Sequence, residues 1–358
     1  MGAVCPKLGL HSGRFGGKID VRRDIKSLLS LARFSSLSVA LVAAAAPAMA
    51  QPPSDPAGIW TLQDENSSVA TGSGLKDKYY VNGLRLNWTS PTDTLPASLS
   101  NFGNWLWGPG RSRYSIELSQ SMYTPANNQI VPPDPRDRPY AGVLTATASL
   151  LHDTDSSRSI LGLQAGVVGP DALAKQMQNG FHSLIGYGPS RGWKYQIHDE
   201  PVADLLAEKI WRVPLVRGGL QMDALPEVAG GAGNLRVYGL AGSVFRIGQG
   251  LDSDYGVARV NPGLSGSDVY VPTRNLVWYF FAGADGQAVA HDITIDGNTF
   301  QSSASATREP FVGELEIGFA VILGRARVSY TQVIQTEEIK GQHGGPHQFG
   351  SLALSLRY

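Results

Sequence analysis

Apolar and polar side chains alternate in segments of about ten residues along much of this chain. The last segment shows the pattern most clearly, because single small or polar residues separate Leu352, Leu354, Leu356 and Tyr358. A period of two is the geometry of a β-strand, in which successive side chains point to opposite faces. Clusters of Gly, Pro, Asn and Asp separate the segments, so the chain predicts an all-β fold.

The apolar runs after residue 50 are short. The run 276–281, for example, is far shorter than the roughly 20 residues of a transmembrane helix. Strands can cross a membrane only as a closed barrel, because closure gives every backbone group a partner. We therefore expect residues 51–358 to form a transmembrane antiparallel β-barrel with a polar lumen.

We predict about twelve strands, and a further strand at the end of the chain would make thirteen. Bacterial barrels have an even number of strands, so one prediction is wrong, and we expect it between residues 193 and 230. The strands begin near Ile59, Tyr80, Tyr114, Ala141, Ile160, Trp193, Leu205, Met222, Leu235, Leu276, Phe311, Arg327 and Phe349. Aromatic residues near strand ends would form girdles at the membrane surfaces, and the candidates are Trp60, Trp88, Trp278, Tyr279 and Tyr358.

Residues 1–50 are predicted to be a signal peptide. Basic residues between 22 and 33 precede the apolar run 39–46, and Ala48-Met49-Ala50 has the form of a cleavage site. The alternative, a membrane anchor, requires a longer apolar run. The first 20 residues do not resemble the start of a signal peptide, which suggests that translation begins near Val21.

Charge and cysteine content exclude several function classes. The chain has 30 basic and 30 acidic residues, and this balance argues against a nucleic-acid partner. Its single cysteine, Cys5, lies in the predicted leader. Cysteine nucleophiles, disulfides and zinc–thiolate sites are therefore not expected after residue 50.

One segment departs from the strand pattern. Residues 170–179 begin with Pro-Asp and continue with good helix formers, so they predict a short helix between two strands. Leu173, Met177 and Phe181 would share one face of it, and Gln178 and His182 another. His182 is then either a catalytic base or a structural histidine at a helix C-terminus, where the dipole favours its charged form.

The other histidines after residue 50 carry weaker signals. His152, His198 and His291 adjoin acidic residues near strand ends, and a surface turn is the simpler interpretation of each. His343 and His347 flank a Gly-rich loop, which is a weak metal motif.

Several phrases occur together in a fixed order, and they span residues 65–66, 77–86, 137–142, 166–170, 178–182, 192–201 and 233–234. As a set they resemble the lipid A 3′-O-deacylase family of Gram-negative outer membranes. The resemblance covers almost the whole chain after the leader. It implies a twelve-stranded barrel whose active site lies between the barrel wall and a helix, on the outer-leaflet side.

The resemblance also implies an activity. Such an enzyme hydrolyses the 3′-linked acyloxyacyl ester of lipid A, with a histidine as general base on water and Ca²⁺ stabilising the oxyanion. His182 matches the family's base, and Gln178 and Asn66 match further functional positions. The implied partners are lipopolysaccharide and the outer membrane.

This chain departs from the family pattern at three positions. Ser67 stands where the family has an Asp beside Asn66, so the resemblance assigns catalysis and metal binding to Asn66 and Ser67. Val81 stands where a Thr is expected, and Ile130 lies near the position of a substrate-binding Lys. Losing the Asp would weaken calcium binding or the orientation of the base. Neighbouring acids that could substitute for it are Asp64, Glu65 and Asp77.

These departures leave two alternatives to lipid A hydrolysis. The first is a non-catalytic barrel of the same family. The second is an acyl hydrolase that acts on phospholipid.

Overall fold

The computed structural model of this chain describes residues 52–70, 77–260 and 268–358. The chain divides into Met1–Met49 and Ala50–Tyr358, and the fold below is that of the second unit. The predicted leader, its cleavage site and the start near Val21 lie outside the described residues. Within these residues, no helix is long and apolar enough to span a membrane.

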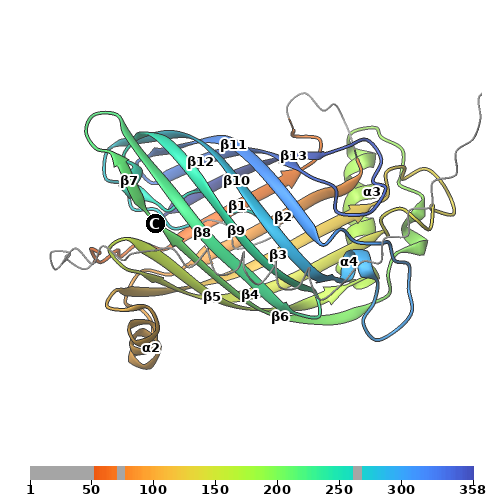
Figure 1. Cartoon of the computed structure of the whole chain (residues 1–358), viewed down its shortest axis with the longest axis horizontal. Helices are drawn as coiled ribbons and strands as arrows, with labels where there is room; N and C mark the ends of the chain where they lie inside the picture. The colour runs from red at the N-terminus through yellow and green to blue at the C-terminus, as the bar shows by residue number, and fades with distance from the viewer. Residues whose placement is uncertain (1–51, 71–76, 261–267) are drawn as a thin grey trace, which may run out of the picture. The chain divides into compact units, whose positions relative to one another are not determined.

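The described part of the second unit is a closed antiparallel barrel of twelve strands (Figure 1). Consecutive strands pair with each other, and β1 pairs with β13 and β6 with β8 to complete the ring. This confirms the predicted all-β barrel. The strands are β1 Ile59–Asn66, β2 Tyr79–Thr89, β3 Arg111–Thr124, β4 Ala141–Asp153, β5 Ser157–Val168, β6 Glu200–Trp211, β8 Gln221–Gly233, β9 Arg236–Gln249, β10 Leu276–Asp292, β11 Phe311–Leu323, β12 Ala326–Gln335 and β13 His347–Arg357. A short β7, Val213–Val216, pairs with β8 alone.

The wrong strand prediction is the one near Trp193. Residues Gly192–Tyr195 form a 3₁₀ helix, η2, and not a strand. Trp193 is buried against the Tyr140 ring, with the ring centroids 5.0 Å apart. The apolar side chain of Trp193 therefore packs inside a loop and does not mark a strand. The remaining helices are α2 Ala97–Trp107, η1 Pro170–Ala172, α3 Ala174–Leu184, η3 Leu251–Ser253 and α4 Ile293–Asp296.

The alternation in β13 is confirmed. Leu352, Leu354 and Leu356 are about half exposed, whereas Ser351 and Ser355 between and beside them are buried in the barrel. Side chains therefore point alternately outward and into the lumen, as the pleat of a strand requires. Apolar outward faces and polar inward faces suit a barrel wall that is surrounded by lipid.

Charged side chains fill much of the lumen. Arg246 is paired with Asp223 at 2.6 Å and with Asp254 at 2.5 Å, and Arg327 contacts Asp254 at 3.4 Å. Arg259 is paired with Glu314 at 2.5 Å. Buried charges persist only when they are paired and hydrogen-bonded, and these pairs meet that condition.

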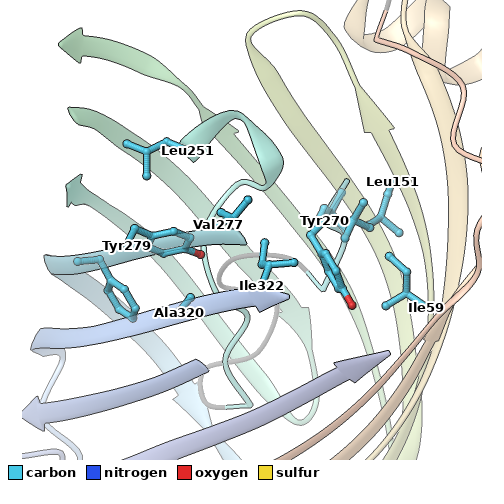
Figure 2. Close-up of a cluster of buried hydrophobic side chains, with 11 residues drawn as sticks. Ile59, Leu151, Leu251, Tyr270, Val277, Tyr279, Ala320 and Ile322 are labelled. Carbon is cyan, nitrogen blue, oxygen red and sulfur yellow. The ribbon is translucent and has the colours of Figure 1, made fainter. Parts of the chain in front are cut away.

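An apolar cluster also occupies the lumen. Described residues from the connection between β9 and β10 lie inside the barrel, where Leu251, Val269 and Tyr270 pack against strand residues such as Val277 and Ile322 (Figure 2). The prediction of a polar lumen is therefore only partly correct.

Both ends of the barrel sequence lie at one edge of the barrel, where β1 begins and β13 ends (Figure 1). We call this the terminal end and the opposite edge the loop end. Trp60, Trp88 and Tyr358 lie at the terminal end, and Trp88 Nε1 donates a hydrogen bond of 2.7 Å to the Tyr358 hydroxyl. They form part of an aromatic girdle with Trp278. Tyr279 was predicted to belong to it, but it is buried in the lumen and donates to Asp254.

Candidate active site

The helix α3 lies at the loop end, in the long connection between β5 and β6 (Figure 1). The predicted helix spans 170–179, whereas the structure has the 3₁₀ turn η1 followed by α3 from Ala174 to Leu184. Leu173 separates the two with a left-handed φ of 61°. The prediction is correct in type, and its bounds differ because this turn resets the helix start.

A glycine lets α3 lie close to the outer face of the barrel. A Cβ atom on Gly142 of β4 would lie 2.7 Å from the Ala174 Cβ and 3.2 Å from the Ala172 Cβ. Gln120 of β3 donates from Nε2 to the Ala172 carbonyl at 2.5 Å. The start of α3 is thus held on the wall by close packing and by a hydrogen bond.

Gln178 and His182 share one face of α3, as predicted, and both are buried. Both contact the Asp77 carboxylate. Gln178 Nε2 lies 2.9 and 3.0 Å from its two oxygens, and His182 Nε2 lies 3.1 Å from Oδ2. Trp193 Nε1 donates to Gln178 Oε1 at 2.6 Å, which orients the amide so that its NH₂ group faces Asp77.

Asp77 is the centre of this network. It lies in the loop between β1 and β2, outside the barrel strands, and Asn128 Nδ2 donates to it at 2.7 Å. Burial raises the pKa of Asp77, while hydrogen bonds from Gln178 and Asn128 and the charge of His182 oppose that shift. A carboxylate with several donors is a suitable partner for a histidine that gains charge during a reaction.

The hydrogen-bond partner of the second ring nitrogen indicates the tautomer of His182. Nδ1 lies 2.9 Å from the Gly188 carbonyl oxygen, which can only accept a hydrogen bond. Nδ1 therefore carries a hydrogen. Nε2 lies 3.1 Å from Asp77 Oδ2, and a second hydrogen lies between these two atoms, because two lone pairs at that distance would repel each other. We assign both hydrogens from the geometry of the network.

Two hollows meet at the Asp77–His182 pair. The first, which we call the apolar cavity, has a volume of about 190 Å³ and lies between α3 and the outer faces of β1, β2 and β3. Its lining includes Leu84, Met122, Met177, Phe181 and Ile185.

The second hollow, the polar cleft, has a volume of about 520 Å³. Its lining includes Lys78, Asn127, Asn128 and Gln129. Asp77 and His182 line both hollows. The pair therefore has the apolar cavity on one side and the polar cleft on the other.

The structure brings only some of the predicted site residues together. Asn66 and Val81 line the apolar cavity near Gln178 and His182. Val81 reaches it at a β-bulge in β2, where the register with β3 shifts between Tyr80 and Asn82. Ser67 is buried and its hydroxyl lies 3.4 Å from the Val81 carbonyl, so it does not join the lining.

Ile130 is the other predicted residue outside the two hollows. Its side chain is about half exposed, and the residues just before it, Asn127 to Gln129, line the polar cleft in its place. The structure thus offers no contact between Ile130 and His182, although the same loop reaches the site.

Oxygen donors line one part of the apolar cavity. Asp64 and Asn66 point to the same side of β1, and Ser68, Asp77 and Asn82 add further oxygens. Asn82 Nδ2 donates to Asp64 Oδ1 at 2.6 Å. Carboxylate, amide and hydroxyl oxygens are the ligands that Ca²⁺ prefers. In the described residues, no group of three or more acidic or histidine side chains is arranged to hold a metal, so a cation here would rely on amide oxygens and water as well.

Sequence reasoning missed three contributors to the site. Asn128 and Gly188 lie in loops with no pattern of their own, and Trp193 was assigned to a strand. The sequence offers Asp77 as one of three acids that could replace the missing Asp. Only the folded loops show that it is the acid beside His182.

The chain is similar to known outer-membrane proteins. Residues 36–358 match the profile of the family described as outer membrane protein LpxR. No curated protein matches. Among solved structures, LpxR from Salmonella typhimurium is 20% identical with a TM-score of 0.70, over 83% of this chain and 99% of that one. The β domain of the Bordetella autotransporter BrkA is 11% identical, over 86% and 99% of the two chains, with a TM-score of 0.39.

Proposed function

This chain belongs to the LpxR family of outer membrane proteins, and from that membership we propose that it hydrolyses the 3′-linked acyloxyacyl ester of lipid A. The protein is a barrel of the bacterial outer membrane. We assign the loop end to the outside of the cell, where lipid A forms the outer leaflet, because the long loops of such barrels face outward.

The observation that carries this proposal is the position of the Asp77–His182 pair between the apolar cavity and the polar cleft. Lipid A is an amphiphile whose esters join sugars to acyl chains. A bound molecule would place an acyl chain in the cavity and its sugar in the cleft. The ester between them would then lie at His182.

His182 would act as a general base. Its Nδ1 hydrogen bonds to the Gly188 carbonyl, so Nε2 is the nitrogen available for proton transfer. The base form is the pair without the hydrogen between Nε2 and Asp77, and a water bound between these two groups would then give its proton to Nε2. The resulting hydroxide attacks the ester carbonyl, and the imidazolium then returns its proton to the leaving sugar oxygen as the tetrahedral intermediate breaks down. The products are a fatty acid and an alcohol, and no covalent enzyme intermediate is required.

Asp77 and Gln178 would position this base. The Asp77 carboxylate lies 3.1 Å from Nε2, where it stabilises the positive charge that forms on the ring. Gln178 holds that carboxylate through two contacts and is itself held by Trp193. A water that enters from the cavity would bind next to this pair.

A divalent cation fits the donor set of the apolar cavity, and we propose Asp64 and Asn66 as its main protein ligands. When bound, Ca²⁺ would supply positive charge to stabilise the oxyanion. Ser67 was the predicted ligand, but its hydroxyl lies against the Val81 carbonyl outside this cavity, so Asp64 takes the acidic role in this proposal.

Lys78 is a candidate for headgroup recognition. Its side chain lines the polar cleft, where Nζ donates to the His343 carbonyl at 2.9 Å. A lysine ammonium is a common ligand of sugar phosphates. We propose that Lys78 replaces the family lysine whose position falls near Ile130.

Mass spectrometry of lipid A tests the activity directly. Cells that express the protein should lose the mass of an acyloxyacyl group from lipid A, whereas cells with His182→Ala should not. Heat-modifiable electrophoretic mobility of both proteins provides the folding control. Unmodified lipid A in cells with the folded wild-type protein would contradict the proposal, and release of fatty acid from phospholipid would identify the alternative substrate.

Removal of metal provides a second test. Purified protein treated with EDTA should lose hydrolysis, and added Ca²⁺ should restore it. Full activity in EDTA would remove the cation from the proposal.

A further inference from the structure

The helix α2 lies outside the barrel wall at the terminal end, far along the barrel from α3 (Figure 1). It connects β2 to β3 and contains the sequence ASLSNFGNWLW, which has no charged residue. Among its residues only Gly103 is buried. A soluble surface helix normally places charged side chains on its exposed face, so this composition calls for an explanation.

A polar anchor holds α2 to the outer face of the barrel. Ser112 of β3 and His152 of β4 are paired across the two strands, and both occupy outward positions, beside the lumen-facing Arg113 and Leu151. His152 is nevertheless 0% exposed, because α2 and the chain after it cover this site. The interpretation of His152 as a surface turn residue is therefore wrong.

The contacts of the anchor are specific. Ser112 Oγ and His152 Nδ1 are 2.8 Å apart, and His152 Nε2 lies 2.9 Å from the Gly108 carbonyl at the end of the helix. The Trp107 ring stacks on the imidazole at 5.6 Å. A Cβ atom on Gly103 would lie only 2.7 Å from His152 Nδ1, so this close approach requires glycine. The helix is thus fixed to the lipid-facing side of the wall.

The exposed surface of α2 has an apolar and a polar flank. Each residue of a helix advances by about 100°, so Leu99, Phe102 and Leu106 lie on one side of Gly103. Ser100 and Asn104 lie on the other side, whereas Asn101 lies near the face turned away from the barrel. Trp105, which is 77% exposed, lies on the face turned away from the barrel.

The position of the helix indicates what covers the apolar flank. α2 is joined to β2 and β3 at the strand ends that hold Trp88 and Tyr114, whose rings are 5.4 Å apart in the aromatic girdle. Aromatic girdles lie at the boundary between the headgroups and the acyl chains. Phe102 and Trp105, which are both exposed, therefore add aromatic rings outside the wall at the terminal end.

We propose that α2 is an interfacial helix that binds the phospholipid surface of the periplasmic leaflet. Its apolar flank inserts among the upper acyl chains, and its polar flank faces the headgroups and water, as in other helices that lie in a membrane interface. Because the helix is attached to the wall by the His152 anchor, it sets the depth of the terminal end in the bilayer. This role depends on outer-membrane location and does not depend on the catalytic proposal.

Spin labels on the two flanks test the proposal. The chain has one cysteine, Cys5, so Phe102→Cys and Asn104→Cys in a Cys5→Ser background each give one labelling position, and both positions are exposed. The labelled barrels are reconstituted into vesicles of phosphatidylethanolamine and phosphatidylglycerol. Collisions of the nitroxide with dissolved oxygen, which concentrates in lipid, are compared with collisions with a water-soluble nickel chelate.

The proposal expects opposite preferences on the two flanks. The oxygen-to-nickel collision ratio at position 102 should exceed the ratio at position 104 severalfold. Equal, nickel-dominated ratios at both positions would show that the helix lies in water and would overturn the proposal. Protection of position 102 from both reagents would also overturn it, because the flank would then be covered by a second copy of the protein.

Discussion

At the scale of single residues, the site contains Gln178 and His182, which match the family pattern. It also contains carboxylates that could replace the Asp that is missing at position 67. The departure at Ser67 removes a carboxylate, yet two carboxylates, Asp64 and Asp77, line the apolar cavity. Asp77 contacts the imidazole and Asp64 lies with Asn66 on β1. The two acids therefore have different expected roles, one toward the base and one toward the cation.

Substitution of the two acids should separate these roles. Asp77→Asn should lower kcat about 10–100-fold even at saturating Ca²⁺, because it removes the charge that orients and stabilises the base. Asp64→Asn should instead raise the Ca²⁺ concentration that gives half-maximal hydrolysis. Activity is measured as fatty acid released from purified lipid A at a series of Ca²⁺ concentrations.

The exposed Asp171 provides a matched control for these variants, and Asp171→Asn should hydrolyse lipid A like the wild type. If Asp77→Asn shifts only the Ca²⁺ requirement, Asp77 acts as a metal ligand and not as the partner of the imidazole.

Lys78 is expected to act on substrate binding alone. Lys78→Gln should raise KM for lipid A severalfold with a much smaller change in kcat, because the side chain lines the polar cleft and contacts neither His182 nor Gln178 in the described network. Lys175→Gln, on the exposed side of α3, is the control. Initial rates over a range of lipid A concentrations give both constants, and an unchanged KM for Lys78→Gln would refute this role.

At the scale of elements, two helices are held on the outside of the barrel in similar ways. Gly142 lets α3 approach β4 at the loop end, and Gly103 lets α2 approach β3 and β4 at the terminal end. The sequence predicts α3 from its helix formers. It gives no comparable signal for α2, which has no side-chain cap and no charged residue in its first or last turn.

The close packing of α3 predicts a variant that is folded and inactive. Gly142→Val should displace the start of the helix, because even a Cβ atom at this position meets Ala174 at 2.7 Å. Hydrolysis of lipid A should fall at least tenfold while heat-modifiable mobility remains that of the wild type. Gly180→Ala, where a Cβ atom has no neighbour within 4 Å, is the control. Wild-type activity in Gly142→Val would show that the site does not depend on this contact.

At the scale of the whole molecule, paired charges inside the barrel hold a segment of the lumen to the barrel wall. Arg246 of β9 is fully buried and bonds both to Asp223 of β8 and to Asp254 in the segment that enters the lumen. Arg327 of β12 meets the same Asp254. Asp254, which follows β9 in the lumen, is therefore tied to two strands of the wall, β9 and β12.

Removal of one partner from this network should be costly. Arg246→Met leaves two buried carboxylates without their main cation, and breaking a buried ion pair in this way typically costs about 3–5 kcal/mol. Urea unfolding of the barrel in phospholipid vesicles, followed by far-ultraviolet circular dichroism, measures the loss. Arg217→Met, at the exposed turn after β7, should change the free energy of unfolding very little. A stability for Arg246→Met equal to that of this control would show that the network contributes nothing.

Local sequence patterns predict the barrel well because the side chains of each strand match the surroundings of its two faces. One face of a strand meets lipid and the other meets the lumen, so Leu352 and Ser351 differ in character whatever the rest of the chain does. The same reasoning fails at Trp193 and Tyr279. An aromatic residue packs equally well in a membrane girdle, a loop or a lumen, and its own sequence neighbourhood does not distinguish these places.

Strand number, the inserted helix and the pairing of Gln178 with His182 on one helical face all follow from residues near one another in the chain. The contact of Gln178 with Asp77, 101 positions away, does not. It arises because the connection after β5 folds back over the outer faces of β4 and β3, which brings α3 to the loop before β2. Only the folded arrangement therefore decided which acid joins His182, that Ser67 turns from the site, and that α2 lies along the lipid-facing wall.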